Sequence, residues 1–205
     1  MFYPETVTTE TYELIVTLQS KPYLNNFVLV GGTALALQLG HRTSTDIDLF
    51  TTQKPDTNIL AELLKNDFNA DIKATYVFAV FGFINNIKTD IVYKKSHQLQ
   101  NPITVNNIQM ASLEDLAAMK LETVNNRGKL RDFVDIYILL QHFSMKQMFE
   151  FWSFKFDNPN WDSLFRSLHY FEDAQLEPEL KWFFKFDWNK IKKDIMAATK
   201  KIRIE

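Results

Sequence analysis

The amino-acid sequence predicts an α+β fold, in which a small mixed β-sheet flanked by helices is followed by a C-terminal helical half. Two observations predict this class. Up to about residue 105, short apolar runs of strand length alternate with segments of helical spacing, and beyond residue 143 every periodic segment has helical spacing. We therefore expect an α/β core over residues 1–105 and a helical region over residues 106–205 that ends in a helical bundle.

The first half contains the expected strands and the helices that connect them. Residues 5–20 have the apolar spacing of a helix, and residues 27–30 (FVLV) form a short apolar run that ends at Gly31 and Gly32. The apolar segment TALALQLG predicts a buried helix that ends at Gly40. The other expected elements are a strand in DIDLFT, a helix over 57–68, strands in TYVFAVFGFI and IKTDIVY joined by a turn at Asn85-Asn86, and a short strand in ITVNNIQMA.

The second half is expected to consist of helices. Ser112 and Asp115 predict a capping box at the start of the helix LEDLAAMKLETVNNR, which Gly128 would end. Further helices are expected over 130–143, 144–156, about 160–174, and 187–203.

Composition and charge exclude several classes of protein. The chain has 205 residues, is 46% hydrophobic and contains no cysteine, which excludes disulfides, thiolate zinc sites and cysteine nucleophiles. The first residues lack the basic and apolar regions of a signal peptide, and no apolar stretch reaches the roughly 20 residues of a membrane span. We therefore expect a cytoplasmic protein with no membrane partner. The net charge of −2 gives no overall attraction to nucleic acid.

A strand, a Gly-Gly pair and a helix follow one another at residues 28–40. A turn without side chains lets a ligand approach the backbone, and the free N–H groups of the following helix attract anions. Thr33 could add a hydroxyl to such a phosphate site. The same pattern also occurs where a buried helix only needs a tight turn for packing.

Three aspartates supply candidate metal ligands. Asp46 and Asp48 lie at i and i+2 on an expected strand, so their carboxylates share one face. Asp90 lies on IKTDIVY, a strand that could lie beside them. Neighbouring carboxylates repel unless they are solvated, protonated or neutralised, and Mg²⁺ prefers carboxylates together with substrate phosphates. The arrangement suits metal-assisted phosphoryl or nucleotidyl transfer, with Asp90 also able to accept the proton of the attacking hydroxyl. Solvated strand residues are the plainer alternative.

Two segments of the sequence resemble those of a known family. The segment GGTALALQLGHRTSTDIDLF resembles the first motif of the polymerase-beta-like nucleotidyltransferase superfamily, and HRTSTDIDLF is closer still to the AbiEii/AbiGii toxin nucleotidyltransferases. The later segment AAMKLETVNNRGKLRDFVDIYILL is similar to the helical Lys, Arg and Asp-x-x-Asp pattern of the same family. The resemblance covers roughly residues 28–140.

The resemblance implies a nucleotidyltransferase core that holds Mg²⁺ and takes an NTP as substrate, with the helical region completing the active site. It implies metal binding by Asp46, Asp48 and Asp90, and catalytic roles for these three together with Lys120, Asp132 and Asp135. It implies nucleotide binding by Gly31, Gly32, Thr33, Arg42, Ser44 and Arg127. Lys120 would face the nucleotide phosphates or a catalytic carboxylate, and the two aspartates of the next helix would bond to Lys120 and Arg127 or orient them.

The resemblance also suggests partners. A tRNA 3′ end or a protein side chain would be the acceptor, and a cognate antitoxin would be the binding partner of a toxin in a toxin–antitoxin or abortive-infection pair. A non-catalytic nucleotide-binding or scaffold module with the same fold is the alternative. A metal-dependent phosphohydrolase is a further class, disfavoured because the chain has only four histidines and no His-Asp cluster.

Two features of the helical half have open interpretations. All four tryptophans lie between Phe149 and Trp188, where aromatic side chains could stack on nucleic-acid bases but more often form a core. FEFWSFKF alternates as a strand would, yet it also fits one helical face, and we assign it to a helix. Residues 190–203 carry six basic residues and one acidic residue, as either a solvated face or a surface for RNA or a protein partner.

Overall fold

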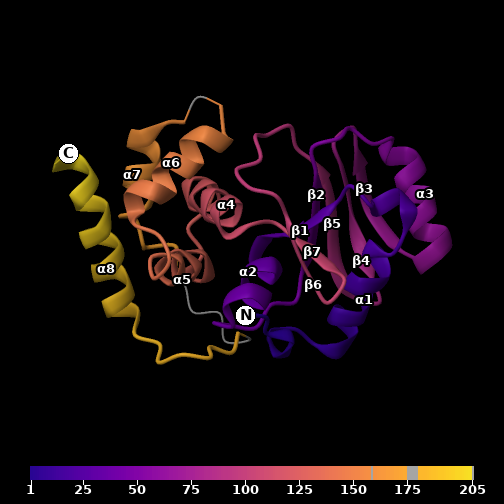
Figure 1. Cartoon of the computed structure of the whole chain (residues 1–205), viewed down its shortest axis with the longest axis horizontal. Helices are drawn as coiled ribbons and strands as arrows, with labels where there is room; N and C mark the ends of the chain where they lie inside the picture. Colours follow the sequence, from indigo (N-terminus) through magenta and orange to yellow (C-terminus); the bar gives the residue numbers. More distant parts are fainter. Residues whose placement is uncertain (158, 175–179, 205) are drawn as a thin grey trace. The chain divides into compact units, whose positions relative to one another are not determined.

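The structure is a computed structural model that describes residues 1–157, 159–174 and 180–204. The chain forms two compact units (Figure 1), one of Met1–Ser96 with Pro102–Ala111 and the other of His97–Asn101 with Ser112–Glu205. The first unit carries the sheet and the second is helical, so the predicted α+β class is confirmed. The boundary expected at residue 105 falls inside a hairpin, β6–β7, that belongs to the first unit.

The sheet of the first unit has the strand order β3-β4-β5-β2-β1-β7-β6. The β2–β5 and β1–β7 pairs are parallel, and the other neighbouring pairs are antiparallel, so the sheet is mixed as expected. The strands are β1 (Val28–Val30), β2 (Ile47–Thr51), β3 (Asp71–Tyr76), β4 (Ala79–Ile84), β5 (Ile87–Tyr93), β6 (Ile103–Val105) and β7 (Ile108–Met110).

The two faces of the central strands have opposite characters. On β2 the burial alternates, with Ile47 and Leu49 buried and Asp48 half-buried between them. Asp48 is paired with Asp90 on β5, and Asp90 is paired with Phe81 on β4, so these three side chains lie on the half-exposed face. The other face is apolar and buried. One face of the sheet is therefore core, and the other is available to a ligand.

Helices of the first unit follow from local sequence. Thr8 caps α1 (Thr9–Gln19) and Asp56 caps α3 (Thr57–Phe68), each accepting a hydrogen bond from a backbone N–H of the first turn. Helix α2 (Gly31–Leu39) is almost wholly buried and ends at Gly40, which has a φ of 66° as the predicted C-cap requires. Helix α3 contacts β3 and β4, α1 contacts β7, and α2 contacts β1 and β2 (Figure 1).

Two hairpins differ from the expectation. The segment TYVFAVFGFI was expected as one strand, but it contains the end of β3, a turn at Val77-Phe78 and then β4. The segment ITVNNIQMA was likewise expected as one strand, but it forms β6 and β7 around Asn106-Asn107. Both asparagines of that turn have positive φ, 50° and 64°, as do those of the predicted Asn85-Asn86 turn, because asparagine tolerates the left-handed region.

The second unit consists of helices around α4 (Leu113–Asn126), with α5 (Leu130–Leu139), α6 (Met145–Lys155), α7 (Trp161–Ser167) and α8 (Trp188–Lys200). The assignment of FEFWSFKF to a helix is confirmed by α6. The helices expected over 130–143 and about 160–174 are shorter than predicted and end at Leu139 and Ser167. Residues 175–179 of the sequence lie outside the described residues.

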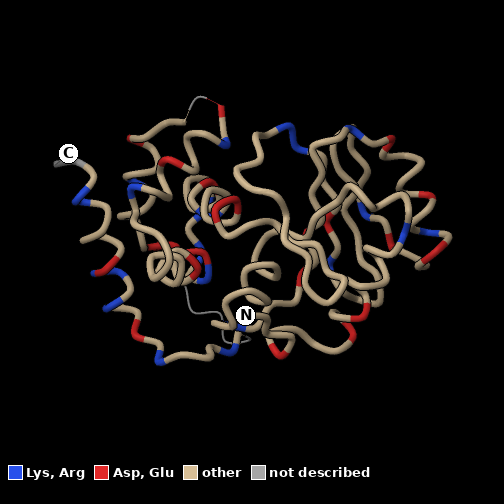
Figure 2. Tube along the Cα trace, in the orientation of Figure 1, with Lys and Arg blue, Asp and Glu red and all other residues tan. Residues whose placement is uncertain are grey.

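Aromatic side chains of the second unit pack mainly against one another. Phe133, Phe171 and Trp188 form one cluster, with ring centroids 4.8–6.0 Å apart. Trp152, which is buried, lies 5.6 Å from Trp161 in an edge-on arrangement. These contacts support the core interpretation of the aromatic excess over base stacking. Basic residues recur along α8 (Figure 2), whose buried stripe includes Ile191, Ile195 and Thr199.

Candidate active site

The Gly31 turn and the Asp48 carboxylate fit each other closely. Gly31 has a φ of 70°, and a Cβ built on it would overlap Asp48 Oδ2, so only glycine leaves room for this carboxylate. Helix α2 starts at Gly31, and its N-cap residue Val30 makes no side-chain hydrogen bond to the first turn. The N-terminal N–H groups of α2 and a carboxylate of β2 therefore meet at one point, where an anion and a cation could be bound together.

A buried layer supports this turn from the loop before β2. A Cβ on Gly32 would overlap the Arg42 guanidinium and would lie 3.4 Å from Ser44 Oγ. Arg42 is 2% exposed and donates from Nη1 to the Thr43 carbonyl at 2.9 Å. The buried hydroxyl of Thr33 lies 2.9 Å from Ser44 Oγ and donates to the Asp46 carbonyl. Thr33, Arg42 and Ser44 thus lie against the glycine turn. Their contacts hold the backbone of this turn and of the segment that carries Asp46.

Asp46 and Asp48 share their environment with Asp90 and with a lysine that was not among the predicted site residues. Asp48 and Asp90 face each other across the parallel strands β2 and β5. Lys88 lies two residues before Asp90 on the same side of β5 and forms an ion pair with Asp90 Oδ2. Burial opposes the charge of Lys88, but the hydrogen bond and the attraction of Asp90, with added attraction from Asp48 and Asp46, raise the pKa of Lys88 above its ordinary value. The i, i+2 spacing to Asp90 is the signal that could have pointed to Lys88.

The chemistry of these donors fits a divalent cation. Asp90 Oδ1 is buried and has no hydrogen-bond partner in the described part of the chain, which leaves one acceptor oxygen available. The Lys88 ammonium already supplies one positive charge at the same carboxylate. Among residues 1–157, 159–174 and 180–204, no group of three or more His, Asp or Glu side chains is gathered closely enough to hold a metal ion. The facing pair Asp48 and Asp90 is what the structure brings together.

The predicted residues of the second unit form a buried ion-pair network. Lys120 Nζ lies 3.1 Å from Asp132 Oδ1 and 2.6 Å from Asp135 Oδ2, and the side chains of both aspartates are fully buried. Arg127 Nε lies 3.3 Å from Asp132 Oδ2 while half of its side chain remains exposed. The ion pairs expected between these residues are therefore present: both aspartates pair with Lys120, and Asp132 also pairs with Arg127. Their roles in binding or catalysis stay predictions. This network lies in the helical unit and forms a second group of candidate residues.

A second buried pair in the helical unit was not predicted. The Asp115 carboxylate forms an ion pair with Lys155 Nζ and accepts hydrogen bonds from the Ser112 hydroxyl at 2.8 Å and the Leu99 amide at 3.2 Å. Lys155 Nζ also donates to the His97 carbonyl at 3.0 Å. This network ties the segment 97–101 to α4 and α6, and its role is structural. Ser112 caps α4 as predicted, although the Asp115 side chain turns to these other partners.

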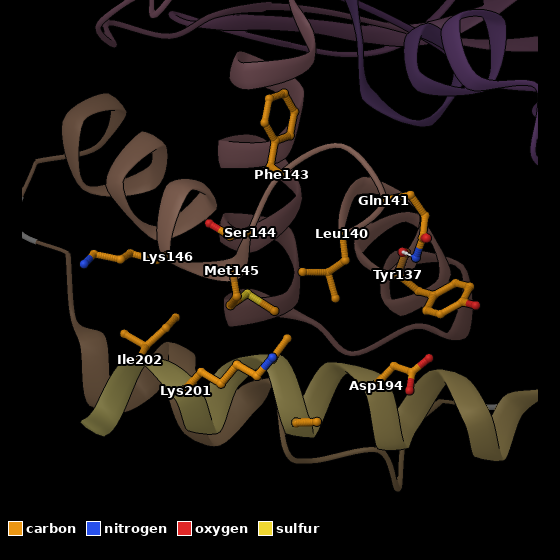
Figure 3. A pocket seen from close by; sticks show the side chains of 12 residues that line it. Tyr137, Leu140, Gln141, Phe143, Ser144, Met145, Lys146, Asp194, Lys201 and Ile202 are labelled. Carbon is orange, nitrogen blue, oxygen red and sulfur yellow. Dashed lines mark hydrogen bonds between the residues drawn. The ribbon is translucent and has the colours of Figure 1, made fainter. Parts of the chain in front are cut away.

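A pocket of about 500 Å³ lies between α8 and the turn from α5 to α6 (Figure 3). Its lining combines aliphatic side chains such as Leu140 and Met145 with Tyr137, Lys146 and Asp194. None of the predicted site residues lines this pocket, so the candidate site is the carboxylate face of the sheet and not this pocket of the helical unit.

Comparison with known proteins decides the family. The family model described as "Nucleotidyl transferase AbiEii toxin, Type IV TA system" matches residues 14–204. The chain belongs to the AbiEii nucleotidyltransferase toxin family. The family expected from the resemblance of its sequence motifs is thereby confirmed, and the chain is a nucleotidyltransferase. An uncharacterized protein of Aquifex aeolicus (strain VF5) is 31% identical over 195 residues, which cover 86% of this chain and 93% of that protein.

Solved structures share the fold of this AbiEii-family chain. MenT4, the nucleotidyltransferase toxin Rv2826c of Mycobacterium tuberculosis H37Rv, is 15% identical with a TM-score of 0.61, over 94% of this chain and 86% of that chain. JHP933 of Helicobacter pylori is 17% identical with a TM-score of 0.57, over 98% and 93%. The antibiotic-resistance factor ANT(2'')-Ia, in complex with adenylyl-2''-tobramycin, is 12% identical with a TM-score of 0.56, over 71% and 96%.

Helices of this AbiEii-family chain are short. Within the part that the structure describes, none is both long and apolar enough to cross a bilayer.

Proposed function

We propose that this AbiEii-family chain transfers a nucleotidyl group from an NTP to an acceptor hydroxyl, on a tRNA 3′ end or a protein side chain, with Mg²⁺ held by the facing pair Asp48 and Asp90 together with the phosphates of the NTP. The observation that carries the proposal is that Asp48 and Asp90 face each other beside the glycine turn at the start of α2. Carboxylates bind the cation, and backbone N–H groups at a helix start bind phosphate oxygens. As the toxin of a type IV pair, the chain would have an antitoxin as its binding partner.

The proposed reaction forms one bond and breaks one bond at the α-phosphorus. The acceptor oxygen attacks this phosphorus, the bond from it to the oxygen that bridges to the β-phosphate breaks, and pyrophosphate leaves. Asp90, whose Oδ1 has no partner among the described residues, accepts the proton of the acceptor hydroxyl. Bound Mg²⁺ would neutralise charge on the phosphates and lower the pKa of the acceptor hydroxyl.

The remaining residues position the substrate. The backbone N–H groups at Gly31 and Gly32 would bind the phosphates, and Arg42, Ser44 and Thr33 hold that turn in place from below. In the second unit, the buried aspartates orient Lys120, while the half-exposed Arg127 would contact the nucleotide.

The decisive experiment incubates the purified protein with Mg²⁺, total tRNA or total protein, and each NTP labelled in turn at the α-phosphate. Label is expected in one acceptor with one or more NTPs, and equimolar pyrophosphate should be released. Asp48→Asn and Asp90→Asn should each lower the transfer rate at least about 100-fold. Asp71→Asn, which changes an exposed aspartate on β3, is the matched control and should transfer at the wild-type rate.

Two outcomes would contradict the proposal. Equal transfer rates in Asp48→Asn and wild type would remove the carboxylates from the reaction. Release of inorganic phosphate from the NTP without any acceptor would indicate a phosphohydrolase instead.

A further inference from the structure

A row of aromatic side chains, two exposed and one half-buried, lies on the same sheet face as the carboxylates. Phe81 is paired with Asp90 across the antiparallel strands β4 and β5, and Phe83 is paired with Lys88. Tyr76 on β3 is paired with Ala79, two residues before Phe81. Residues directly opposite each other on antiparallel strands point to the same side, so Tyr76, Phe81 and Phe83 form an aromatic strip that continues the Asp48–Asp90 face.

Two of the three side chains of the aromatic strip are exposed to solvent and are not part of the hydrophobic core. Tyr76 is 51% exposed and Phe83 is 38% exposed, whereas Val80 and Ile84, which alternate with the strip residues on β4, are buried. Helix α3 contacts β3 and β4 and contributes Leu60, Ala61 and Leu64 to the buried residues of that unit. A sheet face turned to solvent is expected to carry polar residues, so contiguous exposed rings on it indicate a binding surface.

The rings of the strip make both edge-on and stacked contacts. Tyr76 meets Phe81 edge-on, with centroids 5.8 Å apart, and stacks on Phe78 of the adjoining turn at 5.7 Å. Phe83 stands beside the Lys88 side chain, so an aromatic ring and a cation are neighbours at this point. Flat rings next to a cation suit a nucleotide, because the base stacks on the ring while the phosphate is attracted to the charge.

We propose that the aromatic strip of Tyr76, Phe81 and Phe83 binds a nucleobase beside the Asp48–Asp90 pair. The inference rests on the proposed function for that pair and adds the residues that select the substrate. The base belongs to the incoming NTP or to the end of a single-stranded acceptor RNA. Both sources present the same planar ring and nearby phosphate, and the experiment separates them.

The experiment compares Phe83→Ala and Tyr76→Ala with wild type in two binding assays. Calorimetry measures binding of each of the four NTPs with Mg²⁺, and fluorescence anisotropy measures binding of a labelled eight-nucleotide single-stranded RNA without NTP. Loss of one stacked base weakens binding about 5-fold or more. Weakening in the calorimetric assay assigns the base to the NTP, and weakening in the anisotropy assay assigns it to the acceptor. Either result supports the proposal that the aromatic strip binds a nucleobase.

Conservative variants separate stacking from general apolar contact and from folding. Phe83→Trp keeps a flat ring and should retain binding, whereas Phe83→Leu keeps apolar volume but should weaken binding as Phe83→Ala does. Phe154→Ala removes a ring that is 58% exposed on α6 and should bind as wild type does. Thermal unfolding of each variant confirms that it is folded.

Unchanged binding of both probes in the folded Phe83→Ala and Tyr76→Ala variants would overturn the inference. The strip would then be a contact surface for a protein partner. The nucleotidyl-transfer assay keeps this outcome apart from failure of the proposed function. A wild-type chain that transfers label while the strip variants bind normally refutes the strip alone. A chain that transfers no label, yet binds a probe through the strip, refutes only the transfer reaction.

Discussion

Asp48 and Asp90 lie directly opposite each other on the parallel strands β2 and β5, with the Lys88 ammonium bound to Asp90. Facing carboxylates repel, and a cation between strands relieves the repulsion. Lys88, two residues before Asp90 on β5, supplies such a cation to Asp90. Repulsion between the two carboxylates lowers the stability of the folded protein, and the Lys88 ammonium reduces this loss. A bound divalent cation would reduce it further.

Lys88→Met should lower the thermal stability of the protein without Mg²⁺, because Asp90 loses the ammonium that is bound to it. Added Mg²⁺ should then raise the melting temperature more in Lys88→Met than in wild type, since the ion no longer shares Asp90 with an ammonium. Thermal unfolding with and without Mg²⁺ measures both effects. Lys73→Met, which removes the exposed partner of Asp71, is the control, and an equal Mg²⁺ increment in the Lys88 and Lys73 variants would argue against the relationship.

Gly31→Ala should abolish most of the activity and reduce stability. The new Cβ would overlap the Asp48 carboxylate, and the φ of 70° is unfavourable for alanine by about 1–2 kcal/mol. Displacement of one carboxylate by about 1 Å is enough to lower the transfer rate about 100-fold. Urea unfolding and the transfer assay measure the two effects. Gly128→Ala, whose Cβ would lie 3.4 Å from Phe133 Cε2, should be active at nearly the wild-type rate, and equal losses in both variants would refute the explanation.

Lys120→Met should destabilise the protein by about 3–5 kcal/mol, because it leaves two buried aspartates without their shared cation. Denaturant unfolding at neutral pH provides the measurement. The double variant Lys120→Met with Asp135→Asn should recover part of that loss, since one uncompensated charge is removed. Lys190→Met breaks the exposed pair with Asp194 and should leave the unfolding midpoint nearly unchanged. A Lys120→Met variant as stable as wild type would show that the network is not buried in solution.

Asp67 should make the stability of the first unit depend on acid pH. A hydrogen bond from Lys21, and then one from Tyr23, lowers the pKa of Asp67 below its ordinary value, although burial opposes this shift. A lowered pKa in the folded state stabilises the protein above the unfolded-state value of about 4, and this contribution disappears as the pH falls through the folded value. Urea unfolding of wild type and Asp67→Asn should differ at pH 6, and the difference should shrink as the pH falls below about 4. A difference that grows on acidification would contradict this sign.

Local chemistry made several parts of the structure predictable. Gly40 and the Asn85-Asn86 turn adopt the positive φ that their residue types favour, and Ser112 caps α4. Tertiary packing decided what local patterns left ambiguous. The apolar run TYVFAVFGFI is continuous in sequence, yet it turns at Val77-Phe78, because the sheet buries β4 and leaves β3 at its edge. Periodicity alone cannot show where an apolar run reverses direction.

The sequence by itself determined the residue types of the site and their spacing: adjacent glycines, an Asp-x-Asp pair, a later aspartate, and a helical lysine followed by two aspartates. These are short-range patterns, and spacing along one element fixes which side chains share a face. Only the tertiary structure decided that Asp48 faces Asp90, that Lys88 is bound to Asp90, and that Arg42 lies under Gly32. Strand order and register bring together residues far apart in the chain, and these depend on how the whole sheet buries its apolar face.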